Sequence, residues 1–254
     1  MANDFFKSSN PTLSEKTFDK FDNRGSIQDL SERMTIDGTV NKTALLLVLL
    51  LASASFTWYM AGVNPTLVMP LMLAGLFGGL ISAIVIAFKQ TWVSYLAPIY
   101  AILEGLFLGG ISLFFAGMYA GIVLQAVGIT IAVAGSLLFL YKTGMVVVDQ
   151  QFRTAIMTAT MAIMAVYLIS MVLSFFGTTI PYIHQGGIIG ILFSLFVVGI
   201  AAANLLLDFD FIEKGAESGA PKYMEWYGAF ALMVTLVWLY LEILKLLAKL
   251  RGRD

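Results

Sequence analysis

Residues 186–207 read GGIIGILFSLFVVGIAAANLLL, an uncharged run of 22 residues that ends where Asp208 begins. A helix needs about 20 apolar residues to cross the hydrocarbon core of a bilayer, which is about 30 Å thick. Inside the bilayer every backbone N–H and C=O group must bond within the segment, so a run of this length is an α-helix. This stretch therefore predicts a membrane-spanning helix.

Six further apolar runs of similar length surround it. Taken in chain order, the seven predicted spans are 43–63, 67–88, 93–116, 119–141, 154–176, 186–207 and 227–247. None of them shows the alternating polarity of a transmembrane barrel strand. Several connections are very short, so consecutive helices must lie side by side and antiparallel. The sequence predicts an all-α fold, a polytopic transmembrane helix bundle that forms one domain over residues 43–250.

The composition of the chain excludes several classes of function. Of its 254 residues 59% are hydrophobic and 12% are charged, and the mean hydropathy is +0.87. A soluble domain carries about 25% charged residues. The net charge of −1 offers no basic surface for nucleic acid. With no cysteine and the single histidine His184, we expect no thiol nucleophile, no metal centre and no cofactor.

Lysine and arginine positions predict the orientation. Residues 1–42 form a polar tail that holds six of the fifteen basic residues and lacks the features of a secretory signal. Five more lie in loops on the same side as this tail, which predicts a cytoplasmic N-terminus. The last four are Lys245, Lys249, Arg251 and Arg253, and they would lie outside if all seven segments cross. A re-entrant last segment is the alternative.

Acidic residues inside the apolar runs are the candidate functional residues. Glu104 and Glu242 lie within predicted spans, and Asp208 lies at the edge of one. A charge at the bilayer centre costs about 2.5–3.5 kcal/mol on insertion scales, so such residues usually face a bundle interior, a cavity or a partner. Carboxylates that share a poorly solvated cavity titrate as a unit and can gate or bind cations. Two simpler interpretations stay open: Glu242 is an interfacial residue beside Lys245, and Asp208 marks the water boundary.

Small and flexible residues recur at helical spacing in several spans. Glycines let membrane helices approach closely, and this interpretation applies to Gly75, Gly78, Gly79, Gly105 and Gly109. Methionines fill irregular gaps between helices, and we interpret Met157, Met161, Met164 and Met171 as packing residues of the fifth span.

Several short stretches match a known pattern. They are LDFDFIEK at 207–214, AESG at 216–219, LYLEILKL at 239–246, GLFLG at 105–109, and the early NP at 10–11 and EKTF at 15–18. Together with the order of the spans they resemble the Bax inhibitor-1 family (TMBIM, with its bacterial YccA-like branch). The resemblance implies a pH-sensitive calcium leak in which two late acids share a proton and control the pore. By resemblance these acids are Asp208 and Glu242.

The chain departs from the family pattern at this pair. The second acid is Glu242 instead of the usual aspartate, and the two positions lie further apart in sequence than is common in the family. At 1.5 Å per residue, Glu242 lies about 22 Å and Glu104 about 17 Å from the cytoplasmic start of their predicted spans. We therefore predict that Glu104 and Glu242 form a second or replacement carboxyl pair. Lys89 is the candidate counter-ion of Asp208.

Two functions follow from the resemblance. The first is a leak of Ca²⁺ or protons across the bilayer, gated by membrane-embedded carboxylates. The second is a non-conducting regulator that engages an FtsH-type membrane protease through the tail. An enzyme is not expected, because the chain has no Gly-x-Gly-Asp motif and no Ser–His pair in matching spans. The resemblance to the bacterial branch implies the cytoplasmic (inner) membrane of a bacterium.

Overall fold

The structure, a computed structural model, describes residues 33–177 and 187–252. These residues form seven long helices, as predicted, and each is long and apolar enough to span a membrane. They are α2 (Ile36–Val63), α3 (Val68–Phe88), α4 (Val93–Met118), α5 (Ile122–Lys142), α6 (Gln150–Phe175), α7 (Ile188–Glu217) and α8 (Met224–Arg251), with short 3₁₀ turns η2 (Pro65–Leu67) and η3 (Gln90–Trp92). The prediction of an all-α transmembrane bundle is confirmed.

Polar residues set the helix ends beyond the apolar runs. The Thr35 side chain accepts a hydrogen bond from the backbone N–H of Gly38, so α2 begins seven residues before the predicted start at 43. At the other extreme, α7 continues for ten residues past 207 and carries Asp208 inside it. The apolar runs delimit only the part of each helix that needs hydrocarbon around it. Water and capping groups permit the helix to continue on either side.

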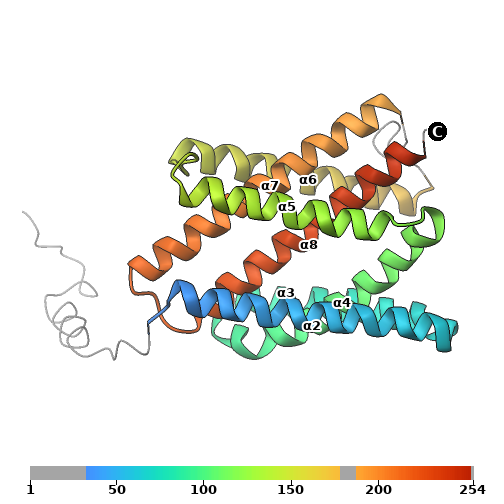
Figure 1. The fold of residues 1–254 in the computed structure, drawn as a ribbon, viewed down its shortest axis with the longest axis horizontal. Coiled ribbons are helices and arrows are strands. Elements are labelled where there is room, and N and C mark those ends of the chain that lie inside the picture. The colour runs from blue at the N-terminus through green and yellow to red at the C-terminus, as the bar shows by residue number, and fades with distance from the viewer. Residues whose placement is uncertain (1–32, 178–186, 253–254) are drawn as a thin grey trace, which may run out of the picture.

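The helices form two groups with α8 between them (Figure 1). One group contains α2, α3 and α4, and the other contains α5, α6 and α7. In the first group two glycines permit close helix approach, because a side chain at Gly75 would meet the Leu103 carbonyl oxygen at 2.4 Å and one at Gly105 the Leu50 carbonyl oxygen at 2.2 Å. The prediction that these glycines serve helix packing is confirmed.

Helix α8 is the central element because it belongs to both hydrophobic cores. Its first half packs Ala229 and Met233 against Leu46 of α2 and Val93 of α4. Its second half contributes a different set of side chains to the second core. That core contains Ile122 and Ala126 of α5, Ala201 and Leu205 of α7, and Leu239, Ile243 and Leu244 of α8.

Helix α8 also extends without a break from one end of the bundle to the other. Its start is bound to α2 through an ion pair between Glu225 and Lys42. Near its end, Arg251 donates to the Ala120 carbonyl oxygen at 2.7 Å, in the connection between α4 and α5. It also donates to Gln125 of α5 at 2.8 Å. Its 28 residues span about 42 Å without interruption. The helix runs from one end of the bundle to the other, which favours seven crossings over a re-entrant last segment.

We call the end of the bundle that holds Ile36 and Met224 the N-terminal end, and the end that holds Val63 and Arg251 the C-terminal end.

Helix α6 contacts the rest of the bundle through a narrow stripe. Residues on this stripe alternate three and four positions apart, the spacing of a helix seam. The stripe contains Arg153, Ile156, Thr160, Ile163, Tyr167, Ser170 and Ser174. Met157, Met161 and Met164 lie on the outer face of α6, with 52–62% of their surface exposed, so the prediction that they fill gaps between helices is wrong. Met171 is also half-exposed but lines a cavity at the end of the helix.

Candidate functional site

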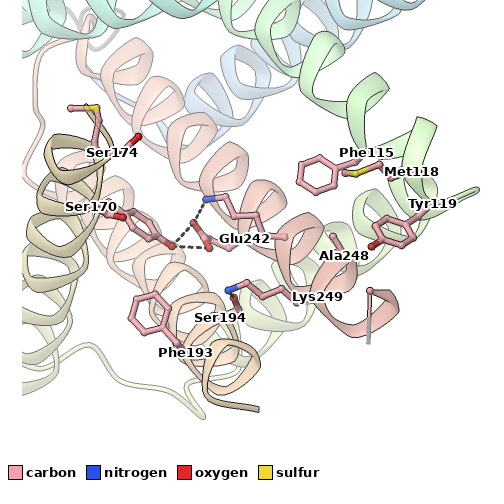
Figure 2. A pocket seen from close by; sticks show the side chains of 14 residues that line it. Phe115, Met118, Tyr119, Ser170, Ser174, Phe193, Ser194, Glu242, Ala248 and Lys249 are labelled. Atoms are coloured by element: carbon pink, nitrogen blue, oxygen red, sulfur yellow. Dashed lines mark hydrogen bonds and ion pairs between the residues drawn. The ribbon is translucent and has the colours of Figure 1, made fainter. Parts of the chain in front are cut away.

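Glu242 is a buried carboxylate in the interior of the helix bundle. It lies on α8, and only 1% of its surface is exposed. The Tyr167 hydroxyl on α6 lies 3.0 Å from each carboxylate oxygen and donates to the group. Lys245, three residues later on α8, donates to Oε1 at 2.9 Å and also lies over the Tyr167 ring, 5.0 Å from its centroid. Figure 2 shows Glu242 with dashed lines that mark these interactions.

This carboxylate lies in the wall of a cavity of about 730 Å³, near the C-terminal end of the bundle. Helices α4, α6, α7 and α8 supply its walls. The lining residues are Phe115, Met118, Tyr119, Tyr167, Ser170, Met171, Ser174, Phe193, Ser194, Glu242, Lys245, Ala248, Lys249 and Gly252. Among them Glu242 is the acid and the two lysines are the cations. We call this cavity the vestibule.

The second lysine of the vestibule ties α8 to the start of α7. Lys249 donates to the Gly190 carbonyl oxygen at 3.1 Å and to the Ser194 hydroxyl at 2.8 Å. Figure 2 shows Lys249 beside Ser194. Lys245, Lys249 and Arg251 are three of the four C-terminal cations that conflict with the predicted orientation. Each is held by groups of the protein itself. Contacts of this kind can override the bias that places cations in the cytoplasm.

Asp208 occupies a separate position two turns of α8 away from Glu242. Its carboxyl group faces the Thr235 hydroxyl on α8, and its Oδ2 atom is buried without a hydrogen-bond partner. Thr235 precedes Glu242 by seven residues, or about 10 Å along the helix. Asp208 therefore does not end its helix, because α7 continues past it to Glu217. The structure does not bring Asp208 and Glu242 into direct contact.

Glu104 also has partners of its own. Its carboxyl group interacts with Tyr100, one turn earlier on α4, and lies against Gly79 of α3, where an added side chain would meet Oε2 at 3.2 Å. Among the described residues Glu104 and Glu242 share no partner. Measured from the observed starts of α8 and α4, Glu242 lies about 27 Å and Glu104 about 17 Å along its helix, a difference of about 10 Å. The structure does not bring the predicted carboxyl pair together.

Lys89, the predicted counter-ion of Asp208, is engaged elsewhere. Its ammonium group lies 4.3 Å from the centroid of the Trp92 ring. The ion pairs found in residues 33–177 and 187–252 include neither Lys89 nor Asp208. Within the same residues no group of three His, Asp or Glu side chains could hold a metal ion. His184 lies outside the described residues.

Two buried acids near the N-terminal end were not predicted as candidates. Asp210 on α7 is 5% exposed and is bound by Arg153 of α6 and Lys214 of α7. Glu225 is completely buried and is bound by Lys42, Lys222 and both the backbone N–H and the hydroxyl group of Thr35. The helical spacings of Asp210 to Lys214 and of Lys222 to Glu225 are signals in the sequence. The sequence gives no signal for the long-range contacts of Glu225 with Lys42 and of Asp210 with Arg153.

Comparison with known proteins identifies the family of this chain. No curated protein and no solved structure matches the chain significantly. A family model described as Bax inhibitor 1 like matches residues 10–252, which is nearly the whole chain and includes every helix described above. The chain therefore belongs to the Bax inhibitor 1 like family of membrane proteins.

Proposed function

We propose that this protein is a pH-sensitive leak for Ca²⁺ or protons, and that Glu242 controls it. The observation that carries the proposal is a carboxylate that is 1% exposed, lies within a membrane-spanning helix and borders a cavity. Ionisable groups at such positions are costly, and in membrane proteins they usually mark a pathway or a relay. Glu242 is therefore the position where an ion entering from the vestibule would meet a fixed negative charge.

In the state that the structure describes, Lys245 occupies that position. Its ammonium group lies 2.9 Å from the Glu242 carboxylate, where a permeating cation would have to bind. Lys249 adds a second positive charge nearby and interacts electrostatically with Glu242. We propose that this is the closed state, in which Lys245 acts as a cation tethered to the protein.

Protonation of Glu242 would change two contacts at once. A neutral carboxyl group no longer forms an ion pair with Lys245. Its hydrogen bond with Tyr167 also becomes weaker, because bonds to charged groups are about twice as strong as neutral ones. Tyr167 makes one of the polar contacts that hold α6 among the described residues, and Arg153 to Asp210 and Thr160 to Asn204 are others. We propose that pH acts on the leak by loosening α6 at its Tyr167 contact.

Asp208 and Glu104 are the other acids proposed to line the ion pathway. Asp208 faces Thr235 on α8, deeper in the bundle than Glu242 when approached from the vestibule. Its unpartnered Oδ2 atom leaves one acceptor available to an ion or a water molecule. Glu104 lies at the α3–α4 contact, away from these two residues, and we assign it an accessory role.

The test is Ca²⁺ flux into liposomes that contain the purified full-length protein, measured from mildly acidic to mildly alkaline pH. We expect a pH-dependent flux in the native protein and loss of that pH dependence in Glu242→Gln, because the amide cannot titrate. Glu217→Gln makes the same chemical change at an exposed position at the end of α7 and should leave the profile unchanged.

Two outcomes would count against this proposal. An unchanged pH profile in Glu242→Gln would remove Glu242 from the control of the leak. Flux equal to that of empty liposomes would contradict the leak itself and favour the alternative, a non-conducting regulator of an FtsH-type membrane protease. In that case deletion of residues 1–32 should abolish protease binding.

A further inference from the structure

A second cavity lies between the two groups of helices. Its volume is about 750 Å³. Helices α2 and α4 line it from one group, α5 and α7 line it from the other, and α8 lies between the two groups (Figure 1). Along α2 the lining extends from Thr43 to Trp58, and along α5 it extends from Val123 to Leu138. We call this space the lateral cavity.

The lateral cavity opens between α2 and α5. Both helices pack against α8, but they do not pack closely against each other, and the structure describes both completely. At the rim, Trp58 of α2 and Ile131 of α5 keep 41% and 67% of their surface exposed. At the floor, Leu108 of α4 and Leu205 of α7 are at most 5% exposed. Because all these helices are long and apolar enough to span a membrane, the medium at the rim is lipid hydrocarbon.

The walls of the lateral cavity are apolar. No charged side chain lines it among the described residues. The hydroxyl groups of Thr43 and Thr130 donate to carbonyl oxygens of their own helices at 2.9 Å and 2.7 Å. The hydroxyl groups of Ser112 and Tyr240 bond to each other at 2.7 Å, between α4 and α8. Since these groups have partners within the protein, the cavity suits a hydrocarbon better than a polar ligand.

The shape of the lateral cavity fits a chain instead of a helix. Its lining covers about 22 Å along α2 and the same length along α5. Spread over this length, its volume gives a mean cross-section of roughly 30 Å². A helix with its side chains is 10–12 Å across and needs about 80 Å² or more. The space therefore excludes a helix of a second copy or of another protein, whereas one hydrocarbon chain can enter it.

We propose that the lateral cavity binds one acyl chain of a membrane phospholipid, which enters from the bilayer between α2 and α5. The chain supplies the dispersion contacts that these two helices do not make with each other. Recognition depends on the chain, so the charge of the headgroup should not decide binding. The proposal does not depend on the leak, because it is tested by binding.

The experiment is native mass spectrometry of the full-length protein, purified from membranes in neutral detergent. We expect a monomer that retains one phospholipid, which its mass identifies. Gly135 lies on the α5 wall of the cavity, and a side chain added there begins in open space. Gly135→Phe should therefore occupy the cavity and lower the affinity for phospholipid about tenfold, the usual cost of overpacking a site.

A matched control makes the same substitution outside the cavity. Gly128 lies two turns earlier on α5, is exposed, has open space around it and does not line the cavity. Both substitutions improve the helix propensity equally, so Gly128→Phe should retain the lipid. If Gly135→Phe does not fold, Ser55→Phe enters the same cavity from its exposed rim on α2.

The thermal unfolding temperature gives a second measurement. A ligand that binds the folded state raises this temperature. Added phosphatidylcholine and phosphatidylglycerol should both raise it in the native protein and in Gly128→Phe, but not in Gly135→Phe. Without lipid, Gly135→Phe should unfold at a higher temperature than Gly128→Phe, because its side chain fills the empty space.

Three results would overturn the proposal. One is a protein that retains no phospholipid and gains no stability from it. Another is equal retention by the folded Gly135→Phe and Gly128→Phe variants, which would place the lipid elsewhere on the surface. The third is a dimer that Gly135→Phe alone dissociates, which would assign the opening to a second copy of the chain.

Discussion

Lys245 is the residue at which the proposed leak can be tested most directly. Its ammonium group is bound to a carboxylate that has almost no exposure to solvent. Lys245→Met keeps much of the length of the side chain and removes the charge. We expect Ca²⁺ flux at neutral pH to rise severalfold, because the Glu242 carboxylate is then open to an external cation. Liposome flux beside the native protein measures the change.

A matched double variant separates this effect from loss of stability. Removing one partner of a buried ion pair typically costs about 3–5 kcal/mol, whereas replacing both partners can be neutral. Glu242→Gln/Lys245→Met should therefore unfold at a temperature closer to that of the native protein than Lys245→Met does. It should also lose the increased flux, because no carboxylate remains. Increased flux in the double variant would show that the leak is a defect of packing.

Sequence reasoning identified Glu242 and the neighbouring Lys245, but not Tyr167. An acid within an apolar run is visible in the sequence, because it contradicts the composition of its own helix. Tyr167 is not visible in this way, since a tyrosine in a membrane span is ordinary. Similar depth led to the predicted pairing of Glu104 with Glu242. Depth says nothing about the direction in which a side chain points, and Glu104 faces Gly79 on α3.

At the level of helices, Glu225 fastens α2 to the start of α8. Its buried carboxylate accepts hydrogen bonds from Thr35 and ion pairs with Lys42 and Lys222. Glu225→Gln keeps the shape and removes the charge, which leaves both lysines without their counter-ion. We expect a loss of stability on the order of 3 kcal/mol, the lower part of the range for breaking buried pairs. The unfolding temperature in detergent measures it.

The control for this prediction is Glu217→Gln. Glu217 is exposed at the end of α7, so the same substitution should change the unfolding temperature little. Equal effects of the two substitutions would mean that Glu225 contributes no more than an exposed acid. The α2–α8 junction would then depend on the apolar core to which Leu46 and Met233 both belong.

The seven spans were predictable because the length of an apolar run is a local property of the sequence. Their ends were less predictable, since Thr35 extends α2 by capping it and α7 continues through its own acids. The methionines of α6 show a second limit. In a soluble protein, apolar residues at helical spacing indicate a buried face. In a bilayer the outer face is apolar as well, so Met161 follows the same spacing while facing outward.

At the scale of the whole molecule, α2 begins and α8 ends at opposite ends of the bundle, so we expect Ile36 and Arg251 to lie on opposite sides of the membrane. The chain contains no cysteine, so a single introduced cysteine is a unique label. Thr66 and Leu250 are exposed near the C-terminal end of the bundle, and Ser218 is exposed near the N-terminal end. In intact bacterial cells we expect a membrane-impermeant maleimide to label Thr66→Cys and Leu250→Cys. Ser218→Cys should react only after the membrane is opened, which would place the N-terminus in the cytoplasm.

Labelling of Leu250→Cys only together with Ser218→Cys would contradict a complete seventh crossing. The last helix would then enter and leave on one side, with all basic residues in the cytoplasm. The proposed ion path could then not begin at an outer opening of the vestibule.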